Sequence, residues 1–95
     1  MLWAELSLSP KGRSLRASFE ALLQTRAEIV EARRIIGRAD YLLRVCAREL
    51  SAWPQLLEHL DPRGDLVHKA QVQVEDAVAK RFSGLPQFTA PMHDR

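Results

Sequence analysis

EIVEARRIIGRADYLLRV, residues 28–45, decides the fold of this 95-residue chain. It contains two runs rich in β-branched and aliphatic residues, at 29–36 and 40–46, and both runs have strand composition. The short break at residues 37–39 begins with Gly37, which adopts backbone conformations that other residues avoid. The stretch therefore predicts a β-hairpin with a tight turn.

The segment before the hairpin predicts a strand followed by a helix. Aliphatic residues alternate with other residue types from Leu2 to Leu8, which places an aliphatic row on one side of an extended chain. The cluster from Ser9 to Gly12 is typical of a turn. From Ser14, a candidate N-cap, apolar residues recur at helical spacing, so we expect a helix to about Arg26.

The segment after the hairpin predicts a second helix and one ambiguous element. Ser51 is a candidate N-cap for a helix that ends before Asp61–Gly64. The apolar residues from Val67 to Val78 fit a helical stripe, whereas residues 70–74 alternate as a strand does, and periodicity alone does not decide between them. We expect one domain over residues 1–82 and an irregular C-terminal tail over 83–95.

This order of elements predicts an α+β fold of the ferredoxin-like type, a βαββαβ sandwich with one sheet face covered by both helices. The other face stays uncovered in the single chain, and in dimeric α/β barrels a partner sheet packs on this face. A sheet face that is partly apolar favours association with a second sheet. We expect four residues to form that interface: Trp3, Leu42, Arg44 and Cys46.

Three segments resemble the ligand-sensing half, or RAM domain, of the Lrp/AsnC transcription regulators. The central hairpin has a G-x-x-D-[FY] turn, written here as Gly37-Arg-Ala-Asp-Tyr41. LSAWPQLL, residues 50–57, is similar to the family's second helix, and KRFSGLP, residues 80–86, resembles its usual ending. The resemblance extends from about Leu2 to Pro86 and favours a strand for the ambiguous element.

The resemblance implies dimers formed through the open sheet faces, rings of dimers, and amino-acid effectors bound near the hairpin turn. The family also normally has an N-terminal helix-turn-helix, whereas here the first strand starts at Met1. We therefore expect either a stand-alone sensing domain without direct contact to nucleic acid, with a full-length regulator as a candidate partner, or a truncated piece of such a regulator. Small dimeric enzymes such as cofactor-free monooxygenases share this fold and remain the alternative.

The predicted ligand site follows from the resemblance and from charge complementarity at the turn. Asp40 would hold an ammonium group, and backbone N–H groups near Gly37 would hold a carboxylate. The alternative is purely structural: Gly37 permits a positive φ, and Asp40 caps the turn. At the matching point of the last strand the family usually has small hydroxyl residues, and this chain has longer amides. The full set of predicted ligand residues is Gly37, Arg38, Asp40, Tyr41, Gln71 and Gln73.

Composition narrows the function classes. The formal net charge of +2 comes from fourteen basic and twelve acidic residues that are interleaved, so no basic patch for nucleic acid is predicted. A single cysteine excludes an internal disulfide and fits a reducing cytoplasm. No stretch has the apolar length of a membrane span. Histidines and acidic residues lack catalytic or metal-ligand spacing, so we expect no catalytic site, metal or cofactor.

Overall fold

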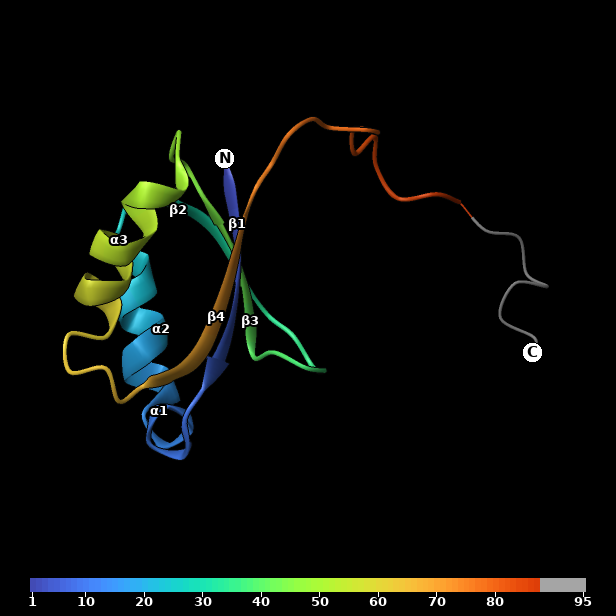
Figure 1. The fold of residues 1–95 in the computed structure, drawn as a ribbon. Helices are drawn as coiled ribbons and strands as arrows, with labels where there is room; N and C mark the ends of the chain where they lie inside the picture. Colours follow the sequence, from blue (N-terminus) through green and yellow to red (C-terminus); the bar gives the residue numbers. More distant parts are fainter. Residues whose placement is uncertain (88–95) are drawn as a thin grey trace.

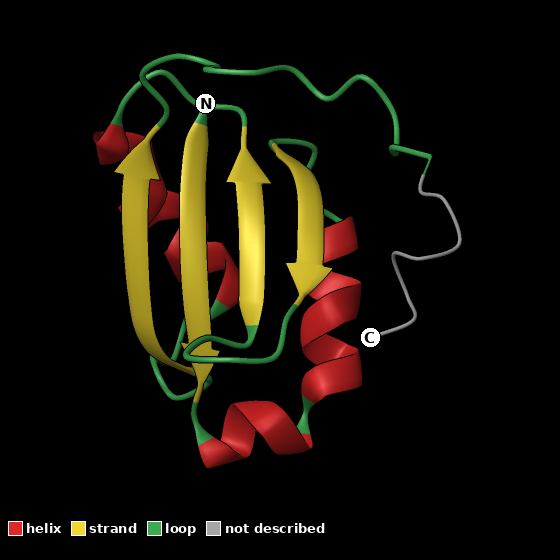
Figure 2. Cartoon of the chain, turned by 90° about the vertical axis from the view of Figure 1, so that its right-hand side faces the viewer, coloured by secondary structure: helices red, strands yellow, loops and turns green. Residues whose placement is uncertain are grey.

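The computed structural model describes residues 1–87, and it has the element order that the sequence predicts with one additional short helix. The strands lie side by side in one sheet, and the helices pack on one of its faces (Figures 1 and 2). The elements are β1 (Leu2–Leu8), α1 (Pro10–Ser14), α2 (Arg16–Gln24), β2 (Ile29–Arg34), β3 (Tyr41–Val45), the 3-10 turn η1 (Leu50–Ala52), α3 (Trp53–Leu60) and β4 (Val67–Val74).

The sheet is antiparallel throughout, with strand order β2-β3-β1-β4. β1 is therefore a central strand, and it pairs with two segments that are distant in sequence, so that Leu2 lies between Val45 and Val74. The register places Trp3 beside Arg44, and Glu5 between Leu42 and Gln71. The α+β, ferredoxin-like prediction is confirmed.

The core lies between the sheet and the helices. Every second residue of β1 and β3 is buried against them, as the alternation predicts. Phe19 and Leu23 of α2 and Trp53, Leu56 and Leu60 of α3 complete this core. The opposite faces of β1 and β3 are only half-buried, so the uncovered sheet face is present as expected.

Three element boundaries differ from the sequence prediction. At the second helix, Ser51 is not the N-cap: it lies in the 3-10 turn η1, and α3 begins at Trp53 after Ala52, which makes no side-chain cap hydrogen bond. The first helix begins earlier than Ser14, because Ser9 is its N-cap and accepts a hydrogen bond from the Gly12 N–H at 3.0 Å. Pro10 then occupies the first helical turn, where its missing N–H costs nothing. The second strand ends at Arg34 rather than Ile36.

The segment after β4 begins with a fixed contact and then leaves the body of the domain. Glu75 N–H donates to the Met1 carbonyl at 2.9 Å, and the chain then runs outward on the uncovered side of the sheet (Figure 1). Phe82 and Leu85 are 82% and 86% exposed. The predicted tail over 83–95 lies partly outside the described residues, and the division at residue 82 stays a prediction. Within residues 1–87, no helix has the length and apolarity that crossing a membrane requires.

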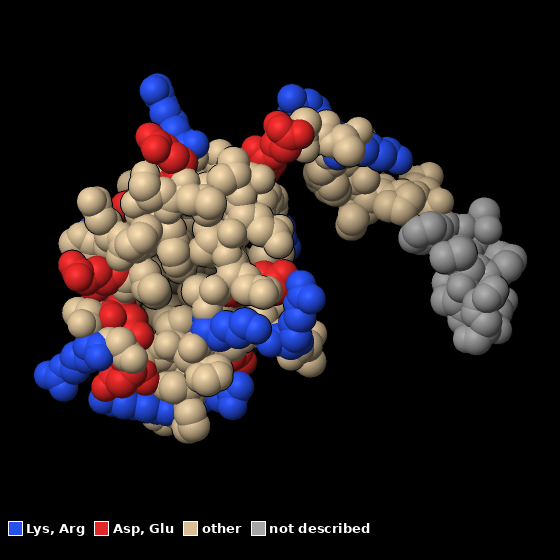
Figure 3. Space-filling view, viewed as in Figure 1, with Lys and Arg blue, Asp and Glu red and all other residues tan. Residues whose placement is uncertain are grey.

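Charged side chains of both signs share the surface in the view of Figure 3, where Lys and Arg are mixed with Asp and Glu. Many of them form ion pairs on or near the sheet, including Arg38 with Glu5 and Arg34 with Glu20. These two pairs lie on opposite sides of the sheet, because Arg34 is opposite the buried Tyr41 while Glu5 is on the uncovered face.

Candidate functional site

The hairpin turn between β2 and β3 is held by backbone hydrogen bonds and by a glycine. Ile35 N–H donates to the Asp40 carbonyl at 2.9 Å, and Asp40 N–H donates to the Leu6 carbonyl of β1 at 2.8 Å. Gly37 has a φ of 153°, which side-chain-bearing residues rarely adopt. The backbone conformation of the turn is therefore enough to explain a glycine at position 37, whether or not a ligand binds there.

Arg38 lies over the uncovered sheet face. Its Nε and Nη2 donate to the two carboxylate oxygens of Glu5 at 3.1 and 3.0 Å, and Ser7 Oγ donates to the Arg38 carbonyl at 3.2 Å. The hydrogen bond from Arg38 lowers the pKa of Glu5, so both charges are present at neutral pH. A hollow of about 60 Å³ is lined by Glu5, Ser7, Arg38, Ala39, Lys69 and Gln71.

The Asp40 carboxylate points toward the helices and is already occupied. It accepts a hydrogen bond from Leu8 N–H at 2.7 Å, and it lies 3.5 Å from Arg16 Nη2 and 3.7 Å from Arg13 Nη2. The Leu8 hydrogen bond, followed by the two arginines, lowers the pKa of Asp40. The carboxylate therefore ties the turn to β1 and to both N-terminal helices.

Tyr41 belongs to the covered side of the sheet. Its ring is buried against Phe19, with ring centroids 5.6 Å apart. Its hydroxyl donates to Glu20 Oε2 at 2.5 Å and accepts from Arg16 Nη1 at 3.2 Å. The predicted ligand residues thus divide between two sides. The structure brings Arg38 and Gln71 together, places Gln73 beside Trp3, and directs Asp40 and Tyr41 toward the helices.

Three of the four predicted interface residues lie within the uncovered face. The Arg44 guanidinium stacks over the Trp3 ring at 5.3 Å and lies 3.5 Å from Glu31, while Trp3 Nε1 donates to Glu75 at 2.8 Å. Leu42 is the cross-strand neighbour of Glu5. Cys46 follows the end of β3 and is exposed. The face therefore combines apolar surface with a charged network.

Sequence reasoning missed several residues that build these sites. Glu5 and Ser7 could have been found, because the alternation of β1 already places them on the uncovered face beside the turn. Arg13, Arg16 and Glu20 give no such signal, because only packing of α1 and α2 on the sheet brings them to Asp40 and Tyr41.

The Asp40 contacts predict a specific pH dependence of stability. Because folding lowers the pKa of Asp40, its stabilising contribution is complete above the unfolded value of about 3.9 and disappears as the pH falls through the folded value. We expect Asp40→Asn to lose about 1 to 2 kcal/mol of unfolding free energy at pH 7 and much less near pH 3. Urea unfolding at both pH values measures this. An equal loss at the two pH values would contradict the assignment.

An antiparallel four-stranded sheet with helices on one face and a charged hairpin turn beside the uncovered face defines a small ferredoxin-like domain. The family model described as the Lrp/AsnC ligand binding domain matches residues 3–68, well over half of the chain. The chain therefore belongs to the Lrp/AsnC ligand binding domain family, which confirms the resemblance found in the sequence.

Solved structures agree with this assignment at the level of the fold. An AsnC family transcriptional regulator from Agrobacterium tumefaciens superposes with a TM-score of 0.71 at 19% identity, over 90% of this chain and 55% of that one. A transcriptional regulator from Neisseria meningitidis in complex with L-Met gives 0.71 at 21% identity, with the same coverage. MtbAldR gives 0.69 at 16% identity, over 88% and 56%. The chain thus spans about half the length of these proteins. A search of curated proteins gave no match.

Proposed function

We propose that this chain is an effector-binding module of transcription regulation that binds an amino-acid-like ligand at the hairpin turn. The observation that carries the proposal is the family match over residues 3–68, which includes the turn and both of its strands. The regulator solved with L-Met supports an amino acid as the ligand class. We also infer that the module is not an enzyme, works in the cytoplasm, and associates with a full-length regulator of the same family.

The chemistry of the turn suits a zwitterion. Arg38 can bind a carboxylate while Glu5 binds an ammonium group, and Gln71, the cross-strand neighbour of Glu5, adds an amide to the same hollow. Gly37 lets the turn approach the ligand closely, and Asp40 and Tyr41 hold the turn from the helix side. Gln73, one pleat further along β4, is placed to contact the far end of a longer ligand.

A second copy of the chain is needed to complete this site. The hollow of about 60 Å³ holds roughly two water molecules, which is too small for an amino acid. Trp3 and Leu42 on the uncovered face, together with the projecting Phe82 and Leu85, offer apolar surface to another copy. We therefore propose a dimer through the uncovered faces, with rings of dimers as the larger assembly.

Native mass spectrometry of the full chain with the standard amino acids tests both parts of the proposal. We expect a dimer or larger species that retains one of these ligands, and we expect Arg38→Gln to bind it at least about tenfold more weakly without a change in subunit number. Arg48→Gln, an exposed arginine away from the turn, is the control.

Three results would contradict different parts of this proposal. A strictly monomeric mass would remove the assembly. A wild-type protein that binds no standard amino acid would remove the ligand class. If Arg38→Gln binds as tightly as the wild type, the turn is not the site, and the ligand class stands.

A further inference from the structure

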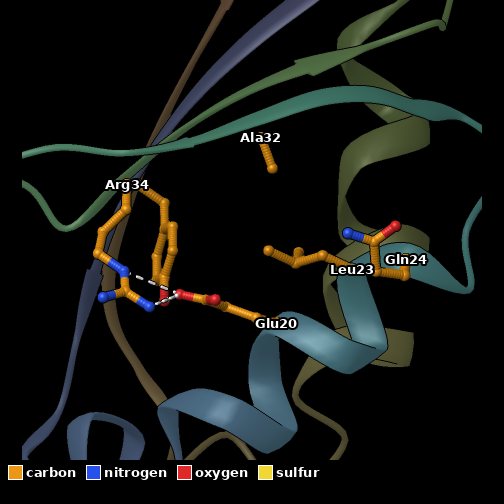
Figure 4. Close-up of a pocket in the computed structure, with 6 residues that line it drawn as sticks. Glu20, Leu23, Gln24, Ala32 and Arg34 are labelled. Carbon is orange, nitrogen blue, oxygen red and sulfur yellow. Dashed lines mark hydrogen bonds and ion pairs between the residues drawn. The ribbon is translucent and has the colours of Figure 1, made fainter.

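Two crevices on the covered side of the sheet differ in how their charged groups are paired. The first lies between α2 and β2, and its volume is about 210 Å³. Figure 4 shows Glu20 and Arg34 joined at one end of it. Arg34 Nε and the Tyr41 hydroxyl donate to the same Glu20 oxygen at 2.9 and 2.5 Å. The charges of this crevice therefore satisfy each other within the chain.

The second crevice is an apolar cleft between the α1–α2 segment and the loop that leads from α3 to β4. The two helices α2 and α3 lie side by side here (Figure 1). The volume of the cleft is about 300 Å³. Four leucines form its apolar surface: Leu60 is fully buried, Leu22 and Leu66 are half-buried, and Leu15 is 41% exposed. Small-molecule sites begin at about this size and have mostly apolar walls.

The walls of the cleft are held in place by hydrogen bonds within the chain. Ser9, the N-cap of α1, donates from its N–H to the Leu66 carbonyl at 2.8 Å and from its hydroxyl to the Asp65 carbonyl at 2.6 Å. The buried Asp61 carboxylate accepts from the N–H groups of residues 65–67 on the same loop. Such a preformed site favours binding, because little ordering has to accompany it.

The rim of the cleft consists of Lys11, Arg63 and Asp65, and its charges are unequally paired. Lys11 Nζ donates to Asp65 Oδ2 at 2.6 Å, while the Asp61 carboxylate is taken up by backbone N–H groups. In the part of the chain that the structure describes, Arg63 takes part in none of the ion pairs. An anionic ligand group is therefore the complement of this rim.

We propose that this cleft binds a medium-chain aliphatic carboxylate, a fatty-acid anion such as octanoate. The hydrocarbon chain packs on the leucines, and the carboxylate accepts from Arg63 at the rim. The size agrees, because about 30 Å³ per water-sized group gives room for roughly ten groups, about the number of non-hydrogen atoms in octanoate.

Other small ligands suit the cleft less well. An amino acid or a sugar would place polar groups against leucine side chains without partners, which costs free energy. The ligand thus differs in class from the proposed effector. Its site is also separate, since the cleft lies on the helix side of the sheet while the hollow beside Arg38 lies on the uncovered face. The inference therefore goes beyond the proposed function.

Calorimetry and leucine-methyl NMR of the full chain with octanoate test this proposal. We expect shifts of the methyl groups of Leu15, Leu22, Leu60 and Leu66, and none at Leu42 on the uncovered face. Butanoate should bind at least about tenfold more weakly, because each buried methylene group contributes about three- to fourfold in affinity. Octylamine, which carries the opposite charge, should also bind at least about tenfold more weakly.

Two variants test the two ends of the site. Arg63→Gln should weaken octanoate binding about three- to tenfold, because a charged contact at an exposed rim is worth less than a buried one. Arg48→Gln, at another exposed arginine, is its control. Leu15→Asp should abolish binding, since it replaces apolar wall with a charge like that of the ligand. Leu50→Asp is its control, because Leu50 is 48% exposed and precedes the opposite end of α3.

Both variants are expected to fold. Arg63 lies in an exposed loop, and Leu15 is the N-cap of α2, where aspartate is a preferred residue. If Leu15→Asp fails to fold, Arg63→Gln still decides the outcome.

Four results would overturn the proposal. They are no binding of octanoate up to about 5 mM, equal affinity in Arg63→Gln and wild type, methyl shifts confined to Leu42, and a lower subunit number in Leu15→Asp without octanoate binding by wild type. The last result would assign the cleft to contact between copies. None of them bears on amino-acid binding at the hairpin turn, which Arg38→Gln tests separately.

Discussion

Gly12→Ala is expected to destabilise the domain by about 3 kcal/mol or more. A Cβ atom at position 12 would lie 2.2 Å from the Leu66 carbonyl oxygen and 3.0 Å from its carbon, and both atoms belong to the backbone. Leu66 cannot shift easily, because its carbonyl accepts the Ser9 N–H at 2.8 Å. Relief of the clash therefore requires α1 to separate from the segment that leads into β4.

Urea unfolding of wild type and Gly12→Ala measures this loss. Ala17→Val is the control, since Ala17 is exposed in the next helix and the change should cost less than about 1 kcal/mol. If Gly12→Ala unfolds within about 1 kcal/mol of wild type, then the close approach of α1 to Leu66 does not exist in the protein.

Asp61→Ala is expected to have an effect of similar size, about 3 kcal/mol, for a different reason. Asp61 is buried at the end of α3. Its carboxylate accepts from the N–H groups of Asp65, Leu66 and Val67 at 2.9 to 3.2 Å. Alanine would leave these donors in a partly buried loop without an acceptor.

The ranking of three variants by their loss of unfolding free energy distinguishes this explanation from a general loss of charge. Asp61→Asn keeps one oxygen acceptor and should lose less than Asp61→Ala. Asp65→Ala, which removes only an exposed ion pair with Lys11, should lose less than about 1 kcal/mol. Urea unfolding gives the energies, and hydrogen exchange at residues 65–67 should accelerate in Asp61→Ala. Equal losses in the three variants would contradict the capping role.

The elements that the sequence predicted well are those whose signal is local. The alternation from Leu2 to Leu8 matches β1 residue for residue. The start of the first helix was missed, because Ser9 and Pro10 suit a turn as well as they suit an N-cap followed by a first helical turn. β4 was ambiguous for a deeper reason. Its strand conformation depends on pairing with β1, whose residues lie 59 to 72 positions earlier in the chain.

In the candidate site, too, the contacts between distant parts of the chain could not be predicted from local sequence patterns. The turn was located correctly in the sequence, but the partners of Asp40 come from α1 and α2, which reach it only after the helices pack. Tyr41 is a different case. Its alternation with Leu43 and Val45 already predicted the covered face, so its placement with the ligand residues came from the family turn motif rather than from the alternation.

The central position of β1 has a consequence for how the chain folds. Of the four strands, β1 is synthesised first, and both of its edges stay unpaired until residues 41–45 and then 67–74 are synthesised. Within residues 1–87, β2 and β3 are the one pair of paired strands that also follow each other in the sequence. Such long-range pairing slows folding. During that delay the alternating apolar row of β1 is exposed with two free edges, which is the state of a strand most prone to join a strand of another chain. Early closure of the hairpin therefore protects the nascent chain by supplying the first partner for β1.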